Sequence, residues 1–160
     1  AVRIIAFSWM TPALLLGEKR VTRRDWHHDY AGRFKAGELV TAYDRSPRVG
    51  GKPVGTIRLT RAPYYSEELP EEDFRAEGFV CLTELGLKVD GTKPTDVWLS
   101  WKRYPEPQWI VRFYLVSLTR YGEELKARWQ VALATRAQER YYRDHPEAGR
   151  VSDETMRRLL

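Results

Sequence analysis

The segment SWMTPALLLGEKRVTRRDW, Ser8 to Trp26, joins a short apolar run to a dense group of cations. Thr11 suits the N-cap of a helix, and Pro12 suits its first turn, where the missing N–H costs no hydrogen bond. Gly17 can adopt the left-handed conformation that ends many helices. We therefore predict a short apolar helix that ends in a cationic turn. Four cations within six residues repel one another, which favours an exposed face or a bound anion.

The composition is that of one globular domain, alone or with an appendage. The chain has 160 residues, of which 42% are hydrophobic and 31% are charged. No apolar run is long enough to cross a bilayer, and the apolar residues 2–7 are interpreted as a strand rather than a signal peptide. The net charge of +5 favours anionic partners.

The few cysteines and histidines limit which disulfides and metal sites the chain can form. The single cysteine, Cys81, allows no intrachain disulfide and suits a reducing compartment, so we predict a cytoplasmic protein. Three histidines and one cysteine show no metal-ligand spacing. We therefore expect no metal, no cofactor and no membrane partner.

The apolar patterns predict an α+β fold. Strands are expected at residues 2–7, 39–43, 54–62, 97–101 and 109–118, the last being the strongest. Helix signals lie within the acidic segment 66–79 and at residues 82–87. Because few regular βαβ crossovers occur, we predict a small mixed β-barrel of about five strands with short flanking helices.

The C-terminal part changes to a helical period. From Glu123 to about Asp144, apolar residues mark one face of a helix of about 33 Å, and Ser152 could cap a short terminal helix. We therefore divide the chain into a barrel domain, residues 1–118, and a helical extension packed on it, residues 119–160. The apolar spacing keeps no strict heptad, which favours a monomer over a dimer through this helix.

Four segments of the chain resemble the ASCH family, small β-barrels related to the PUA RNA-binding domains. They are G-x-K-x-x-T-x-R-D-W at residues 17–26, FKAGELV at 34–40, AEGF at 76–79 and WIVRF at 109–113. They occur in the family's order and cover most of residues 2–118, whereas the tail from Thr119 has no counterpart. The resemblance implies a PUA-like barrel whose cleft, lined by the cationic turn, binds RNA, a nucleotide or a nucleoside.

The resemblance also implies an enzymatic alternative. Some members similar to this pattern are amidohydrolases that remove the acetyl group from the exocyclic amine of acetylated cytidine, and others have been described as ribonucleases. The hydrolytic members use a Lys, a Thr and a Glu, which correspond by motif to Lys19, Thr22 and Glu77. The position after the lysine is often Thr in those members and is Arg20 here.

The chemistry of these three residue types is coherent. A threonine hydroxyl such as that of Thr22 attacks only when a base takes its proton, and Lys19 can be that base if its pKa falls toward neutrality. Burial and nearby arginines lower a lysine pKa, whereas an anion such as Glu77 raises it. Glu77 would therefore orient the lysine or protonate the departing amine, and backbone N–H groups near Gly17 would form part of an oxyanion site. The alternative is that neither residue is catalytic: Thr22 is then an ordinary strand residue, and Lys19 is exposed to solvent.

The ligand-binding candidates are Arg20, Arg23, Arg24 and Trp26. Because Arg23 and Arg24 alternate along a strand, we expect one to enter the cleft and grip a phosphate or carboxylate. The other should lie on the surface or pair with Asp25 or Asp29.

Two tryptophans flank this segment, and either could stack on a base. We expect Trp9 to pack against the barrel and leave Trp26 open between stacking and packing. Three functions remain: binding of RNA or a nucleotide, amide hydrolysis on an acylated nucleoside, and protein interaction through the C-terminal helices. A closed pocket would favour the nucleoside, and an open basic groove would favour RNA.

Overall fold

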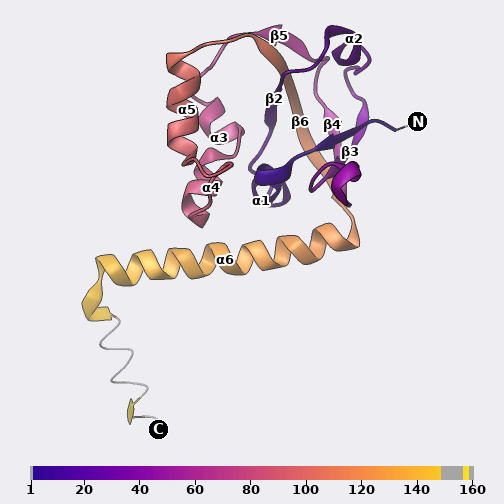
Figure 1. The fold of residues 1–160 in the computed structure, drawn as a ribbon. Coiled ribbons are helices and arrows are strands. Elements are labelled where there is room, and N and C mark those ends of the chain that lie inside the picture. The colour runs from indigo at the N-terminus through magenta and orange to yellow at the C-terminus, as the bar shows by residue number, and fades with distance from the viewer. Residues whose placement is uncertain (1, 149–156, 159–160) are drawn as a thin grey trace.

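The structure, a computed structural model, describes residues 2–148 and 157–158. A mixed β-sheet curls into a half-barrel, short helices flank it, and one long helix crosses its end (Figure 1). The strands are β1 (Ile4–Ala6), β2 (Val21–Arg24), β3 (Leu39–Tyr43), β4 (Pro53–Leu59), β5 (Tyr64–Ser66) and β6 (Gln108–Leu118). The α-helices are α1 (Thr11–Leu15), α2 (His28–Ala31), α3 (Asp73–Ala76), α4 (Phe79–Leu85), α5 (Pro94–Arg103) and α6 (Arg120–Asp144). Two 3₁₀ turns, η1 (Ser8–Met10) and η2 (Pro47–Val49), complete the described elements.

The sheet order β1-β3-β4-β6-β2 leaves β1 and β2 at its two edges. β1 runs parallel to β3, and the other pairs are antiparallel. β6 is long enough to pair with β4 through residues 113–118 and with both β5 and β2 through residues 108–112. The half-barrel therefore has an opening between its edge strands, and the cationic segment of the sequence lies along it.

The hydrophobic core fills the inside of the curl. Fully buried side chains come from α1 and from the strands; they include Leu14, Leu15, Val40, Ile57, Val111 and Phe113. The first half of α6 adds Tyr121, Leu125 and Trp129 to this core. The long helix is thus held against the half-barrel by its N-terminal half and passes beyond it (Figure 1).

Several sequence predictions are confirmed in coarse form. The fold is α+β, with a curled mixed sheet, the long strand β6 and the long helix α6. The sheet has six strands, because β2 and the three-residue β5 belong to it whereas residues 97–101 do not. The short helix expected from Ser152 lies almost entirely outside the described residues.

The strand predicted at residues 97–101 is wrong, because this segment belongs to helix α5. Trp98 is buried whereas its neighbour Leu99 is exposed, and Pro94 is buried one helical turn earlier. Trp98 also contacts Phe74, Phe79 and Trp101. Trp98 and Trp101 are therefore neighbours on one face of a helix, although the alternation of residues in this segment predicted a strand. In the acidic segment 66–79, only the four residues of α3 are helical before Gly78.

Within residues 2–148 and 157–158, the structure has no helix with both the length and the apolar character that a bilayer span requires.

Candidate functional site

A pocket of about 230 Å³ lies at the opening of the half-barrel, where the end of β1 faces β2. Arg24 bridges the two edge strands, because its Nη2 donates to the Ala6 carbonyl at 2.8 Å. The pocket is lined by Ala6, Phe7, Ser8, Met10, Lys19, Thr22, Arg23, Arg24, Glu77, Phe79, Val89, Val97 and Trp101. The structure therefore brings the expected Lys19, Thr22 and Glu77 into one cavity.

Lys19 is almost completely enclosed, with a side-chain exposure of 2%. The turn after α1 fixes its backbone: Gly17 has a φ of +77°, and the N–H groups of Glu18 and Lys19 both donate to the Ala13 carbonyl. Lys19 Nζ donates to the Glu77 carbonyl at 2.9 Å and to Glu77 Oε1 at 3.0 Å. Burial lowers the Lys19 pKa below its ordinary value, and the opposing pull of Glu77 does not cancel this effect.

Glu77 connects the lysine to a second cation. It lies at the C-terminal end of α3, and its Oε2 accepts from Arg23 Nη1 at 2.7 Å while Oε1 accepts from Lys19. Both oxygens of this buried carboxylate are therefore bound by cations. The Glu77 carboxylate therefore holds the side chains of Lys19 and Arg23 in fixed positions.

Asp73 anchors the other end of this network and was not predicted from the sequence. Its Oδ2 accepts from Arg23 Nη2 at 2.6 Å and from Arg112 Nη2 at 2.9 Å, and its Oδ1 accepts from Arg112 Nη1 at 3.0 Å. Burial raises the pKa of the Asp73 carboxyl, but the hydrogen bonds from Arg112 and Arg23 outweigh burial and hold the pKa below its usual value. The acidic run after Pro70 was the available signal, but it does not show which arginines it meets.

Thr22 and Arg24 lie on the same face of β2. Thr22 is buried, and its Oγ1 accepts from Arg24 Nε at 3.1 Å. Burial also lowers the pKa of Arg24. Among the described ion pairs none includes Arg24, so its charge has no contacting carboxylate. A buried cation of this kind beside a hydroxyl favours a ligand that presents a negative or partly negative oxygen.

The expectation that one of Arg23 and Arg24 would lie on the surface or pair with Asp25 or Asp29 is wrong. The two side chains do leave opposite faces of β2, but both faces are covered. Arg23 meets Asp73 and Glu77, and Arg24 lies against Thr22 and Ala6. Arg20, by contrast, is exposed.

The two tryptophans differ in their surroundings. Trp26 stacks on Phe34 at a centroid distance of 4.6 Å and meets Tyr30 edge-on, so it packs against the core. The packing expected for Trp9 is wrong, because 57% of this residue is exposed. Trp9 lies in the turn η1 and does not line this pocket.

The oxyanion site expected near Gly17 is also wrong. The N–H of Gly17 donates to the Leu14 carbonyl, and those of Glu18 and Lys19 donate to the Ala13 carbonyl. These donors end the helix and are not available to a ligand. The pocket donor that does form a hydrogen bond with Thr22 Oγ1 is Arg24 Nε.

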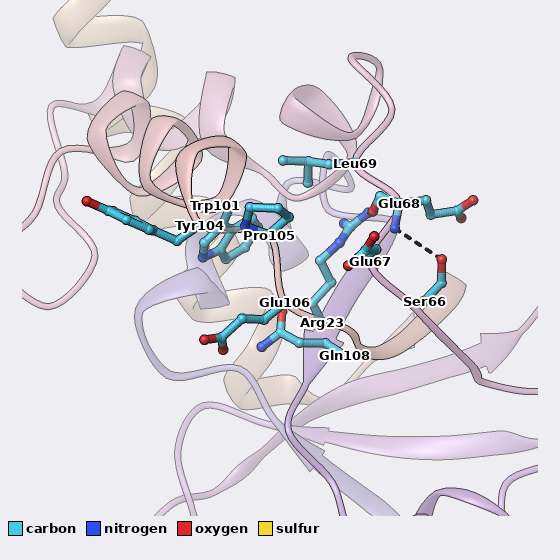
Figure 2. A pocket seen from close by; sticks show the side chains of 10 residues that line it. All are labelled: Arg23, Ser66, Glu67, Glu68, Leu69, Trp101, Tyr104, Pro105, Glu106 and Gln108. Carbon is cyan, nitrogen blue, oxygen red and sulfur yellow. Dashed lines mark hydrogen bonds between the residues drawn. The ribbon is translucent and has the colours of Figure 1, made fainter.

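A second, smaller pocket of about 110 Å³ lies on the other side of Arg23. Figure 2 shows Arg23 reaching toward the 66–69 segment, opposite a wall formed by Trp101, Tyr104 and Pro105. Its rim carries the three carboxylates of Glu67, Glu68 and Glu106. This side of the cationic segment therefore repels phosphates instead of attracting them.

Within the described parts of the chain, no group of three or more His, Cys, Asp or Glu side chains is placed to hold a metal ion. Compared with protein family models, with curated proteins and with solved structures, the sequence has no match. The function is therefore inferred from the residues of the site.

Gly78 fixes the position of Glu77, and its replacement provides a first test of this geometry. Gly78 has a φ of +101°, and a Cβ at this position would lie 2.5 Å from the Ala13 Cβ. We expect Gly78→Ala to lower the free energy of unfolding in urea by about 1 to 3 kcal/mol from the clash, in addition to backbone strain. Gly17→Ala is the matched control, because its φ is +77° and its Cβ would meet no atom within 4 Å. Equal losses in the two variants would contradict close packing at Gly78.

Proposed function

We propose that the chain is an amidohydrolase of ASCH-like type that removes an acyl group from the exocyclic amine of a cytidine-type nucleoside. The supporting observation is the buried Lys19 amine, held by Glu77 in a pocket that also contains the Thr22 hydroxyl. A pocket of about 230 Å³ is large enough for part of a nucleoside-sized ligand.

The state of Lys19 supports a role as general base. Its pKa is lowered by burial, so a larger fraction of the amine is neutral at a given pH. A neutral amine has two N–H bonds, and Glu77 provides two acceptors, its carbonyl and Oε1. Glu77 thus orients the amine and leaves its lone pair free, and we assign this lone pair to the proton of Thr22.

The reaction follows from these roles. Thr22 Oγ1 attacks the acyl carbon and gives its proton to Lys19, and the C–N bond breaks as that proton passes to the departing nucleoside amine. Water then cleaves the acyl–threonine ester, again with Lys19 as base, and releases a carboxylic acid. Arg24 Nε donates to Thr22 Oγ1, and its guanidinium forms none of the described ion pairs, so we assign it to the negative charge that develops on the acyl oxygen.

RNA binding at the cationic turn is the second candidate, favoured by exposed Arg20. It is weaker because Arg23 is neutralised by Asp73 and Glu77 and because acidic residues line the adjacent pocket. Chromatographic assay of acetylated cytidine distinguishes the two. If the chain is the hydrolase, the assay should show release of cytidine and acetate at a rate that depends little on salt concentration. Absence of turnover, together with RNA affinity that falls steeply with salt, would favour the second candidate.

The pH profile gives a separate prediction. Protonated Lys19 cannot act as a base, so kcat/KM should rise with pH through the Lys19 pKa. Glu77 raises that pKa. In Glu77→Gln the amine loses this stabilising anion, so the acid limb of the residual activity should move to lower pH. An unchanged limb, or one moved to higher pH, would contradict the assignment of Lys19 as the base.

A further inference from the structure

A larger pocket of about 500 Å³ lies beside the site, between α1 and the first half of α6. Its wall is largely apolar and aromatic. It is lined by Ser8, Trp9, Thr11, Pro12, Asp44, Leu87, Lys88, Gly91, Tyr121, Leu125 and Trp129. None of the roles assigned above uses this pocket.

The two pockets are neighbours across one short turn. Ser8 lines both the larger pocket and the pocket that contains Lys19 and Thr22, which we call the catalytic pocket. Phe7 and Met10 line the catalytic pocket, whereas Trp9 and Pro12 line the larger one. A second segment repeats this division, because Val89 lines the catalytic pocket and Leu87, Lys88 and Gly91 line the larger one. Two separate segments thus border both cavities, which places the two pockets next to each other.

The wall of the larger pocket favours an apolar occupant. The polar atoms of Asp44 are already engaged: Oδ1 accepts from the Lys52 N–H, and Oδ2 accepts from the Tyr121 hydroxyl. The Thr11 hydroxyl is likewise directed to the Ser8 carbonyl. The indole of Trp9 is 57% exposed, so covering it removes a large apolar surface from water.

We propose that this pocket binds the acyl group of the substrate and that the enzyme therefore prefers apolar acyl chains longer than acetyl. The inference rests on the proposed function. The donors and charges of the catalytic pocket suit the polar nucleoside and the amide, and the acyl chain is the part of the substrate that suits an aromatic wall. Hydrolysis then yields a free nucleoside amine and a medium-chain or aromatic carboxylic acid.

The test is the kcat/KM of the purified full chain for N4-acylcytidines from acetyl to octanoyl. Each methylene buried on binding should raise kcat/KM by about fourfold until the pocket is full. Trp9→Ala should lower kcat/KM for the octanoyl substrate by about tenfold more than for the acetyl substrate, and Trp9→Phe should restore part of the difference. Val49→Ala is the control, because Val49 is 65% exposed on η2 and lies outside this pocket. A flat or falling chain-length series, or equal effects of Trp9→Ala on both substrates, would overturn the proposal.

A binding measurement separates this inference from the proposed function. N4-octylcytidine has an alkyl group in place of the acyl group and cannot be hydrolysed. If no acylcytidine is turned over, the hydrolase is wrong, but calorimetric binding of N4-octylcytidine that is weakened by Trp9→Ala still supports an apolar ligand pocket. Absence of binding overturns it. A concentration-dependent dimer in sedimentation that Trp9→Ala abolishes would also overturn it, because a second chain would then cover this surface.

Discussion

Replacement of Asp73 with asparagine is expected to lower the free energy of unfolding by about 3 to 5 kcal/mol, because a buried charge network then loses its anion. Asp73 is 1% exposed and accepts hydrogen bonds from both Arg23 and Arg112. Asparagine keeps the shape but leaves these cations partly uncompensated. The measurement is urea unfolding at neutral pH. Glu124→Gln is the control, since Glu124 forms an exposed i,i+4 pair with Arg120 and should change stability by less than about 0.5 kcal/mol.

The stability loss in Asp73→Asn should also depend on pH. Because the Asp73 pKa is lowered in the folded state, its contribution is complete above the pKa of an unfolded aspartate, about 3.9. That contribution is lost as the pH falls through the lower folded value. The stability difference between wild type and Asp73→Asn should therefore narrow below about pH 4. A difference that stays constant or widens in acid would contradict an ionised Asp73 as the anchor of the network.

Loss of either reacting group is expected to lower kcat by about a thousandfold or more. Thr22→Val removes the hydroxyl, and Lys19→Met removes the amine, while both keep the approximate side-chain volume. The readout is the initial rate of cytidine release from acetylated cytidine, with circular dichroism to check folding. Thr22→Ser is the matched control, because it keeps a hydroxyl on the same strand. Full activity in folded Thr22→Val would remove Thr22 from the mechanism.

Local patterns predicted the elements that pack through a regular face. β6 carries a run of β-branched and aromatic residues, and α6 carries apolar residues at helical spacing, so both were found close to their observed bounds. The turn after α1 followed from Gly17, which needs a positive φ. The alternation of Val97, Leu99 and Trp101 with Trp98 and Ser100 favoured a strand where α5 lies. Pro94 at the start of α5 and Lys102 and Arg103 at its end were helix signals.

The charge network could not be predicted in the same way. Arg23 and Asp73 are separated by 50 residues, and Arg112 and Asp73 by 39. Their contact depends on how β2, α3 and β6 are placed by packing, which no local pattern encodes. The sequence therefore showed a group of cations without showing that Arg23 is neutralised and that Arg24 has no contacting carboxylate among the described ion pairs. The motif did identify Lys19, Thr22 and Glu77, which the structure places around one pocket.

The central claim is that Lys19 and Thr22 act as one catalytic unit, and a double-variant comparison of kcat tests it most directly. Residues that act in the same step do not have additive effects. For acetylated cytidine, wild type should release cytidine, each single variant should lose about a thousandfold or more, and Lys19→Met/Thr22→Val should lose no more than the worse single variant. Losses that multiply in the folded double variant, or a wild-type protein that releases no cytidine, would contradict the claim.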